Sequence, residues 1–544
     1  MFDSMLLKWL LREPPGIGPS NVPEHQNTAM PLKLSRLKTS SSAALVLIAT
    51  GCAVGPSYET PAAPDVKGYT AGPVAATLAA IPVAGPAGGA QTLNYGAGLR
   101  GDWWQSFGSA DLNRAVQEAL DRNPGLKQSQ ETLTAAEYDY KAAEGAFYPQ
   151  ISAGVGGQRS RVSGAGPTPF PPSVYSLYNE QVTVTYSPDI FGLNRLVARA
   201  EQAQVDLATD QLVAAKLTLE GDVIDTVLDL AASEEALEAT RQSVQDEQQV
   251  YELVRQRYLH GAVSALVLDT QQTQLSDTEA TLPALEQERD ADLHLLSVLT
   301  GRFPTEGVGG DMPLFKDLTL PAELPVTMPT ELVRARPDIR AAEAQLRAAN
   351  AQVGEAVARM YPQFSLSADV GHESDSWGSL FSPANKVWNL AANLFVPIFE
   401  GDTLEAEKES AEAQYRGIFD QYQMTVLDSF RQVADVLAAL HHDADILAAR
   451  SDEDAAAKQA FDLARAQYDA GAIAYLDLLN AEVTYQAARI AFVRAKQQRY
   501  SDTVALYVAM GGGAWQSQTG APAADSRAVP AATTLTAPAA TTGN

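Results

Sequence analysis

The spacing of apolar and polar residues changes abruptly across a proline in the middle of this chain. An alanine-rich helical pattern begins at Arg336 and ends at Pro362, and strict alternation of apolar and polar residues follows as far as Gly371. A period of 3.6 residues is typical of an amphipathic helix, and a period of two is typical of a half-buried strand. We therefore predict a helix that is followed directly by a strand.

The same change of period occurs earlier in the chain, at Pro149. Pro124 and Pro149 precede Pro337 and Pro362, respectively, by the same 213 residues. Three further pairs of motifs recur at a similar distance, namely Pro188–Gly192 with Pro397–Gly401, Arg255–Gly261 with Arg465–Gly471, and Gly301 with Gly511. A repeated spacing over so many residues indicates an internal duplication. Each copy is predicted to contain a helix, two strands, a long helix and a further helix.

Each copy offers two segments with strand periodicity. They cover residues 150–160 and 179–188 in the first copy, and 364–373 and 387–397 in the second. A strand of ten residues spans about 33 Å, enough to cross a bilayer when tilted. Four strands cannot close a barrel and open edges cannot face lipid, so transmembrane strands would have to be pooled by several chains. The alternative is a soluble four-stranded sheet.

A long helical stretch follows each pair of strands. No proline occurs between Pro188 and Pro283, and the first helix, from about 193 to 258, would be roughly 100 Å long. This length favours coiled-coil packing. Gly261 and Gly471 interrupt the two stretches, and we predict that each ends a helix in a left-handed cap. The stretches are therefore interpreted as two helical hairpins.

The N-terminal region has the pattern of a secretory signal. After Met30, three basic residues precede an apolar run over residues 43–50, which Gly51 and Cys52 follow. We take residues 1–29 as an upstream or non-native extension and residues 30–51 as the signal. The chain contains no apolar run of the roughly 20 residues that a transmembrane helix needs.

Composition narrows the possible functions. The 544 residues carry a net charge of −27, which disfavours nucleic acid as a partner, and the single cysteine permits neither an intramolecular disulfide nor a thiolate metal cluster. His441 and His442 are adjacent, so on a helix their side chains point about 100° apart and do not form a chelating pair. No catalytic set stands out. We expect no enzyme activity, no metal and no cofactor.

The remaining segments connect or flank the two copies. We expect residues 52–108 to form an extended tether, with Trp103 and Trp104 packed in the core rather than at a membrane interface, and Ser109 to cap the first helix. The other predicted boundaries are 109–310 for the first copy, 311–329 for a linker, 330–512 for the second copy and 513–544 for a disordered tail.

Together these motifs resemble the bacterial outer-membrane efflux proteins of the TolC-like, NodT-type lipoprotein branch. The matching residues are Cys52 with Gly55–Tyr58, Trp103-Trp104, Tyr148-Pro149, Tyr361-Pro362, Pro188–Gly192 and the two Tyr-x-x-Gly turns followed by Leu266 and Leu476. The resemblance implies a mixed α/β membrane protein. In it, three protomers with four strands each build a 12-stranded barrel above a long periplasmic α-helical barrel.

The resemblance also implies functional residues and partners. Cys52 would carry a diacylglyceryl and acyl lipid that anchors the protein in the outer membrane. Gly261, Ala262, Gly471 and Ala472 would form the hairpin tips that face a periplasmic adaptor, which is joined to an inner-membrane pump of the RND type. Leu476 would belong to an apolar ring that closes the duct. The acidic position of the family falls on Asn480, and Asp477, one helical turn earlier, is the candidate substitute.

The function implied is that of a passive exit duct for small toxic molecules in a trimeric efflux system. An exit channel for secreted proteins is an alternative with the same fold. A coiled-coil lipoprotein with a structural role is an alternative of a different class, and it predicts no conductance.

Overall fold

A computed structural model of the chain describes residues 54–72, 74–163, 171 and 173–513. They belong to two compact units, described separately here. The first unit includes the segments Gly125–Leu212 and Pro337–Ser429, and the second includes Val66–Pro124, Val213–Arg336 and the chain from Phe430. Each unit draws on both copies of the repeat, so the units and the repeats do not coincide. The predicted signal, Cys52 and the predicted C-terminal tail after residue 513 lie outside the described residues.

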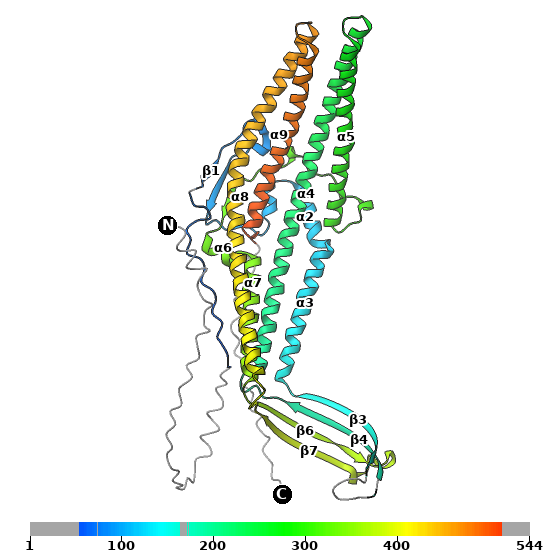
Figure 1. Cartoon of the computed structure of the whole chain (residues 1–544), viewed down its shortest axis with the longest axis vertical. Helices are drawn as coiled ribbons and strands as arrows, with labels where there is room; N and C mark the ends of the chain where they lie inside the picture. Colours follow the sequence, from blue (N-terminus) through cyan, green and yellow to red (C-terminus); the bar gives the residue numbers. More distant parts are fainter. Residues whose placement is uncertain (1–53, 73, 164–170, 172, 514–544) are drawn as a thin grey trace, which may run out of the picture. The chain divides into compact units, whose positions relative to one another are not determined.

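The duplication is confirmed by the order and length of the elements (Figure 1). The first copy contains α3 (Pro124–Glu144), β3 (Gln150–Val162), β4 (Ser173–Tyr186), α4 (Leu193–Leu259) and α5 (Ala265–Leu299). The second contains α7 (Pro337–Arg359), β6 (Gln363–Ser374), β7 (Lys386–Phe395), α8 (Thr403–Asp469) and α9 (Tyr475–Ala509). The helices α4 and α8 both have 67 residues, and α5 and α9 both have 35.

The change from helix to strand is built in the same way in both copies. Proline cannot continue a helix, since its ring clashes with the preceding turn and it lacks an N–H donor. A glutamine follows each proline and donates its side-chain amide back to the end of the helical segment. The Nε2 atom of Gln150 lies 3.0 Å from the carbonyl oxygen of Gly145, and that of Gln363 lies 3.1 Å from that of Ala358. This repeated cap fixes where each strand begins.

In the first unit, the four long strands form one antiparallel sheet in the order β3-β4-β6-β7. All four predicted strands are present. The largest shift in a boundary is at β4, which begins at Ser173 instead of residue 179 because its pairing with β3 continues to Val162. Val174 and Tyr175 are adjacent and both apolar, so the alternation that marks a strand is obscured there.

The helices of the first unit differ sharply in burial. Thirteen residues of α7 are buried, and Leu346 and Val353 pack against Tyr415 and Phe419 of α8. None of the 21 residues of α3, its counterpart in the first copy, is buried. Equivalent helices of a duplicated chain thus have unequal partners within one molecule.

The segment predicted to be an extended tether contains regular structure in the part that belongs to the second unit. Its described residues from 54 to 76 form neither helix nor strand, but β1 (Thr77–Leu78) and β2 (Gln91–Tyr95) follow. The strand β2 pairs in parallel with β5 (Glu323–Val326), which lies in the predicted linker between the copies. The tether prediction was therefore wrong for this part, because a pairing between residues some 230 positions apart leaves no local pattern.

A short helix lies just before the first long helix of each copy, namely α2 (Ala110–Arg122) before α3 and α6 (Pro329–Ala335) before α7. Ser109 caps α2 as predicted, since its side chain accepts a hydrogen bond from the backbone N–H of Leu112. Trp103 and Trp104 are buried, at 2% and 6% exposure, which confirms that they pack in the core.

No helix in the described part of the chain combines the length and the hydropathy that a membrane crossing requires.

Candidate functional site

The two helical hairpins end in nearly identical turns. Gly261 and Gly471 adopt φ angles of 73° and 75°, the left-handed region that glycine tolerates best. In each turn the glycine N–H and the next N–H bond back to the helix end. Ala262 donates to the carbonyl of Arg257 at 2.8 Å, and Ala472 donates to that of Gln467 at 2.8 Å. These bonds form the Schellman cap that satisfies the last carbonyl groups of α4 and α8.

The first turn of α9 carries the predicted gate residues on one exposed surface. The side chain of Leu476 is 62% exposed, and Asp477 and Asn480 are exposed as well. Their neighbours Tyr475 and Leu478 point into the core. In the first copy, Leu266 occupies the matching position and is 74% exposed. An exposed leucine thus stands at the same position at the start of both helices.

Asp477 also has a local structural role. One of its carboxylate oxygens accepts a hydrogen bond from the backbone N–H of Ala474 at 3.2 Å, which caps the start of α9. A negative charge is favourable at a helix N-terminus because of the helix dipole. No hydrogen bond joins the side chains of Asp477 and Asn480 in the described part of the chain, so a gate built from these residues would depend on contacts between copies.

The structure identifies a contact between the hairpins that the sequence analysis missed. Arg257 of α4 donates from Nη2 to the backbone oxygens of Tyr468 and Asp469 at 2.9 and 3.1 Å. Its guanidinium carbon also lies 4.3 Å from the centroid of the Tyr468 ring. The counterpart of Arg257 in the second copy is Gln467, which carries no charge. An arginine in one copy where the other copy has an uncharged glutamine was the feature of the sequence that could have indicated this contact.

Replacing Arg257 with Gln is expected to loosen the second hairpin turn. The loss of two hydrogen bonds and one cation–π contact should cost about 1–2 kcal/mol, or roughly a tenfold rise in local opening. Amide hydrogen exchange across residues 468–474 measures this opening. Arg255→Gln is the matched control, because Arg255 is exposed and its ion-pair partner among the described residues is nearby Glu252. Equal exchange in the two variants would show that Arg257 does not hold the hairpins together.

A buried polar layer joins the two hairpins a few helical turns away from their tips. Glu247 of α4 is fully buried and accepts hydrogen bonds from Thr278 of α5 and Gln486 of α9. Glu482 of α9 is 3% exposed, and one of its oxygens has no hydrogen-bond partner among the described residues. Burial, the nearby carboxylate of Glu247 and that of Asp246 raise the pKa of Glu482 to about 8. Burial also raises the pKa of Glu247.

The four-stranded sheet has two chemically different faces. Directly paired residues of antiparallel strands point to the same side, so the register assigns every side chain to a face. One face is apolar, and its central rows contain Ile151, Ala153, Val182, Val184, Ala368, Val370, Trp388 and Leu390. The opposite face is polar, with Ser152, Thr183, Asp369 and Asn389 in one row. Thr183 donates a hydrogen bond to Asp369 at 2.7 Å across this polar face.

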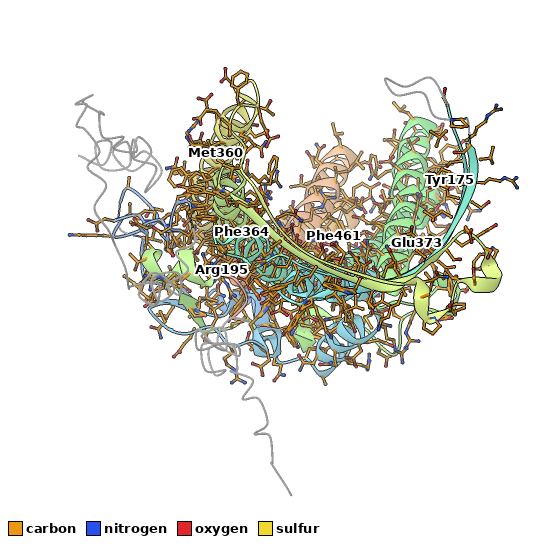
Figure 2. All side chains as sticks on the ribbon, turned by 90° about the horizontal axis from the view of Figure 1, so that it is seen from below. Tyr175, Arg195, Met360, Phe364, Glu373 and Phe461 are labelled. Atoms are coloured by element: carbon orange, nitrogen blue, oxygen red, sulfur yellow. The ribbon has the colours of Figure 1, made fainter. Side chains whose placement is uncertain are left out.

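The apolar face is exposed in the single chain. Trp388, Leu390 and Leu394 of β7 are 76%, 73% and 57% exposed. Figure 2 shows the sheet as a curved layer, with Phe364 and Glu373 toward opposite ends of β6. A sheet with an exposed apolar face and a polar opposite face matches strands that separate lipid from a polar interior. The structure therefore defines an outer-membrane channel protomer with long helical hairpins.

Comparisons with known proteins agree with this class. The model of the outer membrane efflux protein family matches residues 115–302 and 328–512, and the chain belongs to this family. The probable efflux pump outer membrane protein TtgC of Pseudomonas putida is 28% identical over 485 residues, which cover 88% of this chain and 96% of that protein. The outer membrane protein OprJ of Pseudomonas aeruginosa is 30% identical, over 87% of this chain and 95% of that protein.

A solved structure with the same fold is the outer-membrane channel OprN. It superposes with a TM-score of 0.74 at 24% identity, covering 85% of this chain and 99% of that one. The chain is an outer-membrane efflux protein with a large periplasmic part. Its family is one of channels and not of enzymes.

Proposed function

We propose that three copies of this chain form a passive exit duct in the outer membrane. The observation that carries the proposal is the sheet, which has one apolar face, one polar face and two edges, β3 and β7, without a strand partner in the described chain. Unpaired backbone groups in lipid cost several kcal/mol each, so the edges have to meet strands of other copies. Pairing β7 of one copy with β3 of the next would close 12 strands around a polar interior.

The exposed helix α3 supports the same assembly. Its counterpart α7 is buried against other helices of its own chain, whereas no residue of α3 is buried. A neighbouring copy of the chain could pack against α3 in the way that helices of the same chain pack against α7. A ring of copies therefore satisfies the strand edges and the unpartnered helix together.

The duct would receive its cargo from other proteins and would need no enzyme activity of its own. We propose that the tips at Gly261, Ala262, Gly471 and Ala472 contact a periplasmic adaptor, which links the duct to an inner-membrane RND-type pump. Relatives are named for the efflux of toluene, antibiotics and cations, so small toxic molecules are the proposed cargo class. A lipid on Cys52 would hold each copy at the membrane.

The proposed gate lies at the start of α9. Three copies would bring together three exposed Leu476 side chains as an apolar constriction, with Asp477 or Asn480 adjacent. Burying a leucine contributes about 1.5–3 kcal/mol, so this ring would favour the closed state.

Single-channel recording in a planar bilayer tests both the duct and the gate. The purified mature protein should give discrete conducting events, and Leu476→Ser should make them at least about tenfold more frequent, since each of the three copies loses about 1.5 kcal/mol or more that favours closure. Leu463→Ser is the control, because Leu463 is an exposed leucine of α8 away from the first turn of α9. Absence of conductance in all three proteins, with the trimer verified in detergent, would refute the duct. Equal conductance in all three would refute the gate.

A further inference from the structure

The basic side chains of the four strands all lie on one face of the sheet. The register places Asp369 and Glu373 on the polar face. It places all three Arg and Lys residues of the four strands, Arg159, Arg161 and Lys386, on the apolar face. One carboxylate, Glu180, also lies on the apolar face, in the row of Val155. Cations on a face that meets lipid require a negatively charged partner or water.

The basic residues lie at one end of the apolar face only. Arg159 pairs with Ser176, and Arg161 pairs with Val174, beside the loop that joins β3 to β4. Lys386 is the first residue of β7, next to the loop after β6. The chain enters β3 and β6 from helices and leaves β4 and β7 into helices at the opposite end of these strands. The large helical part of the family is periplasmic. The basic end of the sheet therefore faces the outer leaflet of the membrane.

An aromatic residue separates the two arginines from the apolar rows, whereas Lys386 pairs with His372 in the row of Val155. Tyr178 of β4 lies on the apolar face between the row of Val155 and the row of Arg159. Its ring lies 4.8 Å from that of Trp377, which is 54% exposed. Tyr and Trp gather at the level of lipid headgroups in membrane proteins. Arg159 and Arg161, one and two further rows along β3, are thus at the level of the headgroup phosphates.

The two arginines are available to bind an anion. Both are exposed, and neither forms an ion pair with another residue that the structure describes. The connecting sequence from Ser163 to Pro172 contains no charged residue that could neutralise them. Alternate residues of a strand are about 7 Å apart, so two guanidinium groups project side by side. The carboxylate on the same face, Glu180, already faces His372 at 3.2 Å.

We infer that Arg159, Arg161 and Lys386 bind the phosphate groups of a phosphorylated glycolipid of the outer leaflet. This inference rests on the proposed closed ring in one respect, because there β3 of one copy adjoins β7 of the next. Lys386 then lies on the strand that neighbours the two arginines, at the seam between copies. Arginine suits such a ligand because its planar fork binds phosphate oxygens in pairs. The bound lipid would seal each seam on the outer side.

Lipid binding by the purified protein in nanodiscs tests this inference, with diphosphoryl lipid A and phosphatidylglycerol as the two probes. The protein should bind lipid A more tightly. The double variant Arg159→Gln, Arg161→Gln should lose about 30-fold in lipid A affinity. Arg159→Lys, Arg161→Lys keeps the charge and should retain most of the binding. Lys67→Gln, at an exposed lysine of the second unit, should change nothing.

Three outcomes separate the possibilities. Unchanged lipid A affinity in the Gln variant would overturn the site. Equal affinity for both probes, with equal dependence on the arginines, would overturn the assignment to an outer-leaflet glycolipid. Conductance is recorded on the same preparations, and the Gln variant should conduct as the parent protein does. If the parent protein shows no conductance, the proposed duct is refuted, whatever the result of the lipid-binding measurement.

Discussion

Glu482→Gln is expected to abolish a pH-dependent loosening of the two hairpins. Glu482 is 3% exposed on α9, and its pKa is raised to about 8 from an ordinary value near 4.5. The folded state therefore retains a proton that the unfolded state releases. The stability associated with this proton is fully present below about pH 4.5, declines as the pH rises, and is lost above pH 8.

The expected size of this effect is large. A pKa shift of this size corresponds to a difference of about 4–5 kcal/mol in the free energy of unfolding between the protein with Glu482 protonated and the protein with Glu482 ionised. The groups that face Glu482 are Glu247 and Asp246 of α4, which oppose its ionisation, and Arg465 of α8, which favours it. Arg465 already pairs with Asp246 at 3.6 Å and donates to Gln249 at 2.5 Å, so it offsets the two carboxylates only in part.

Thermal unfolding and amide exchange of α9 between pH 5 and pH 9 measure this effect. The parent protein should lose stability across that range, and exchange in α9 should accelerate. Glu482→Gln mimics the protonated acid, so its stability should stay nearly flat and exceed that of the parent at pH 9. Glu453→Gln removes an exposed carboxylate of α8 and should leave the slope unchanged. A Glu482→Gln slope as steep as that of the parent would show that another group is responsible.

The sequence was sufficient to predict those features that depend on local chemistry. A proline after each helix and alternation after each proline located α7 with β6 and α3 with β3. The absence of proline predicted α4. The glycines at 261 and 471 predicted the two turns, because glycine tolerates the positive φ angle that such a turn requires. In each case the cause lies within a few residues of the effect.

Features that depend on distant partners could not be predicted in this way. The pairing of β2 with β5, the contact of Arg257 with Tyr468 and the approach of Glu482 to Glu247 all join segments more than 200 residues apart. Helical periodicity shows which side of a helix is buried but not which helix covers it. The pattern of α3 predicts a helix as clearly as that of α7, yet only α7 is buried within the chain.

A partial signal existed for the buried acid. Glu482 lies four residues after buried Leu478 and seven after buried Tyr475, on the apolar stripe of α9. A carboxylate on such a stripe is costly unless it is paired or protonated, so its position alone indicates a special environment. The candidate gate residues offer no comparable signal, since Leu476 and Asn480 are exposed and their partners in the proposed ring would belong to other copies.

Replacing Trp103 with Ala is expected to destabilise the second unit by about 3–5 kcal/mol, the usual cost of deleting a buried tryptophan. Trp103 is 2% exposed and stacks on Tyr507 of α9, with ring centroids 5.0 Å apart and an interplanar angle of 18°. Its Nε1 atom donates to a carboxylate oxygen of Glu220 at 3.0 Å. Alanine leaves a cavity and also removes this donor.

The loss of the donor makes the effect depend on pH, which separates it from the loss of packing. Burial raises the pKa of Glu220 to about 7, and the hydrogen bond from Trp103 opposes that rise. Trp103→Phe keeps most of the ring and removes only the donor, so the pKa of Glu220 should rise further. In the folded variant Glu220 then keeps its proton to higher pH. The loss in the free energy of unfolding, relative to the parent protein, should be small at pH 5 and reach about 1–3 kcal/mol above pH 8.

Trp103→Ala should add a further loss in the free energy of unfolding that is constant with pH. Thermal unfolding at both pH values measures the two parts, with Trp377→Ala, at an exposed tryptophan of the first unit, as the control. A deficit of Trp103→Phe that is the same at pH 5 and pH 9 would mean that the hydrogen bond to Glu220 does not contribute, and that Trp103 stabilises the unit through packing alone.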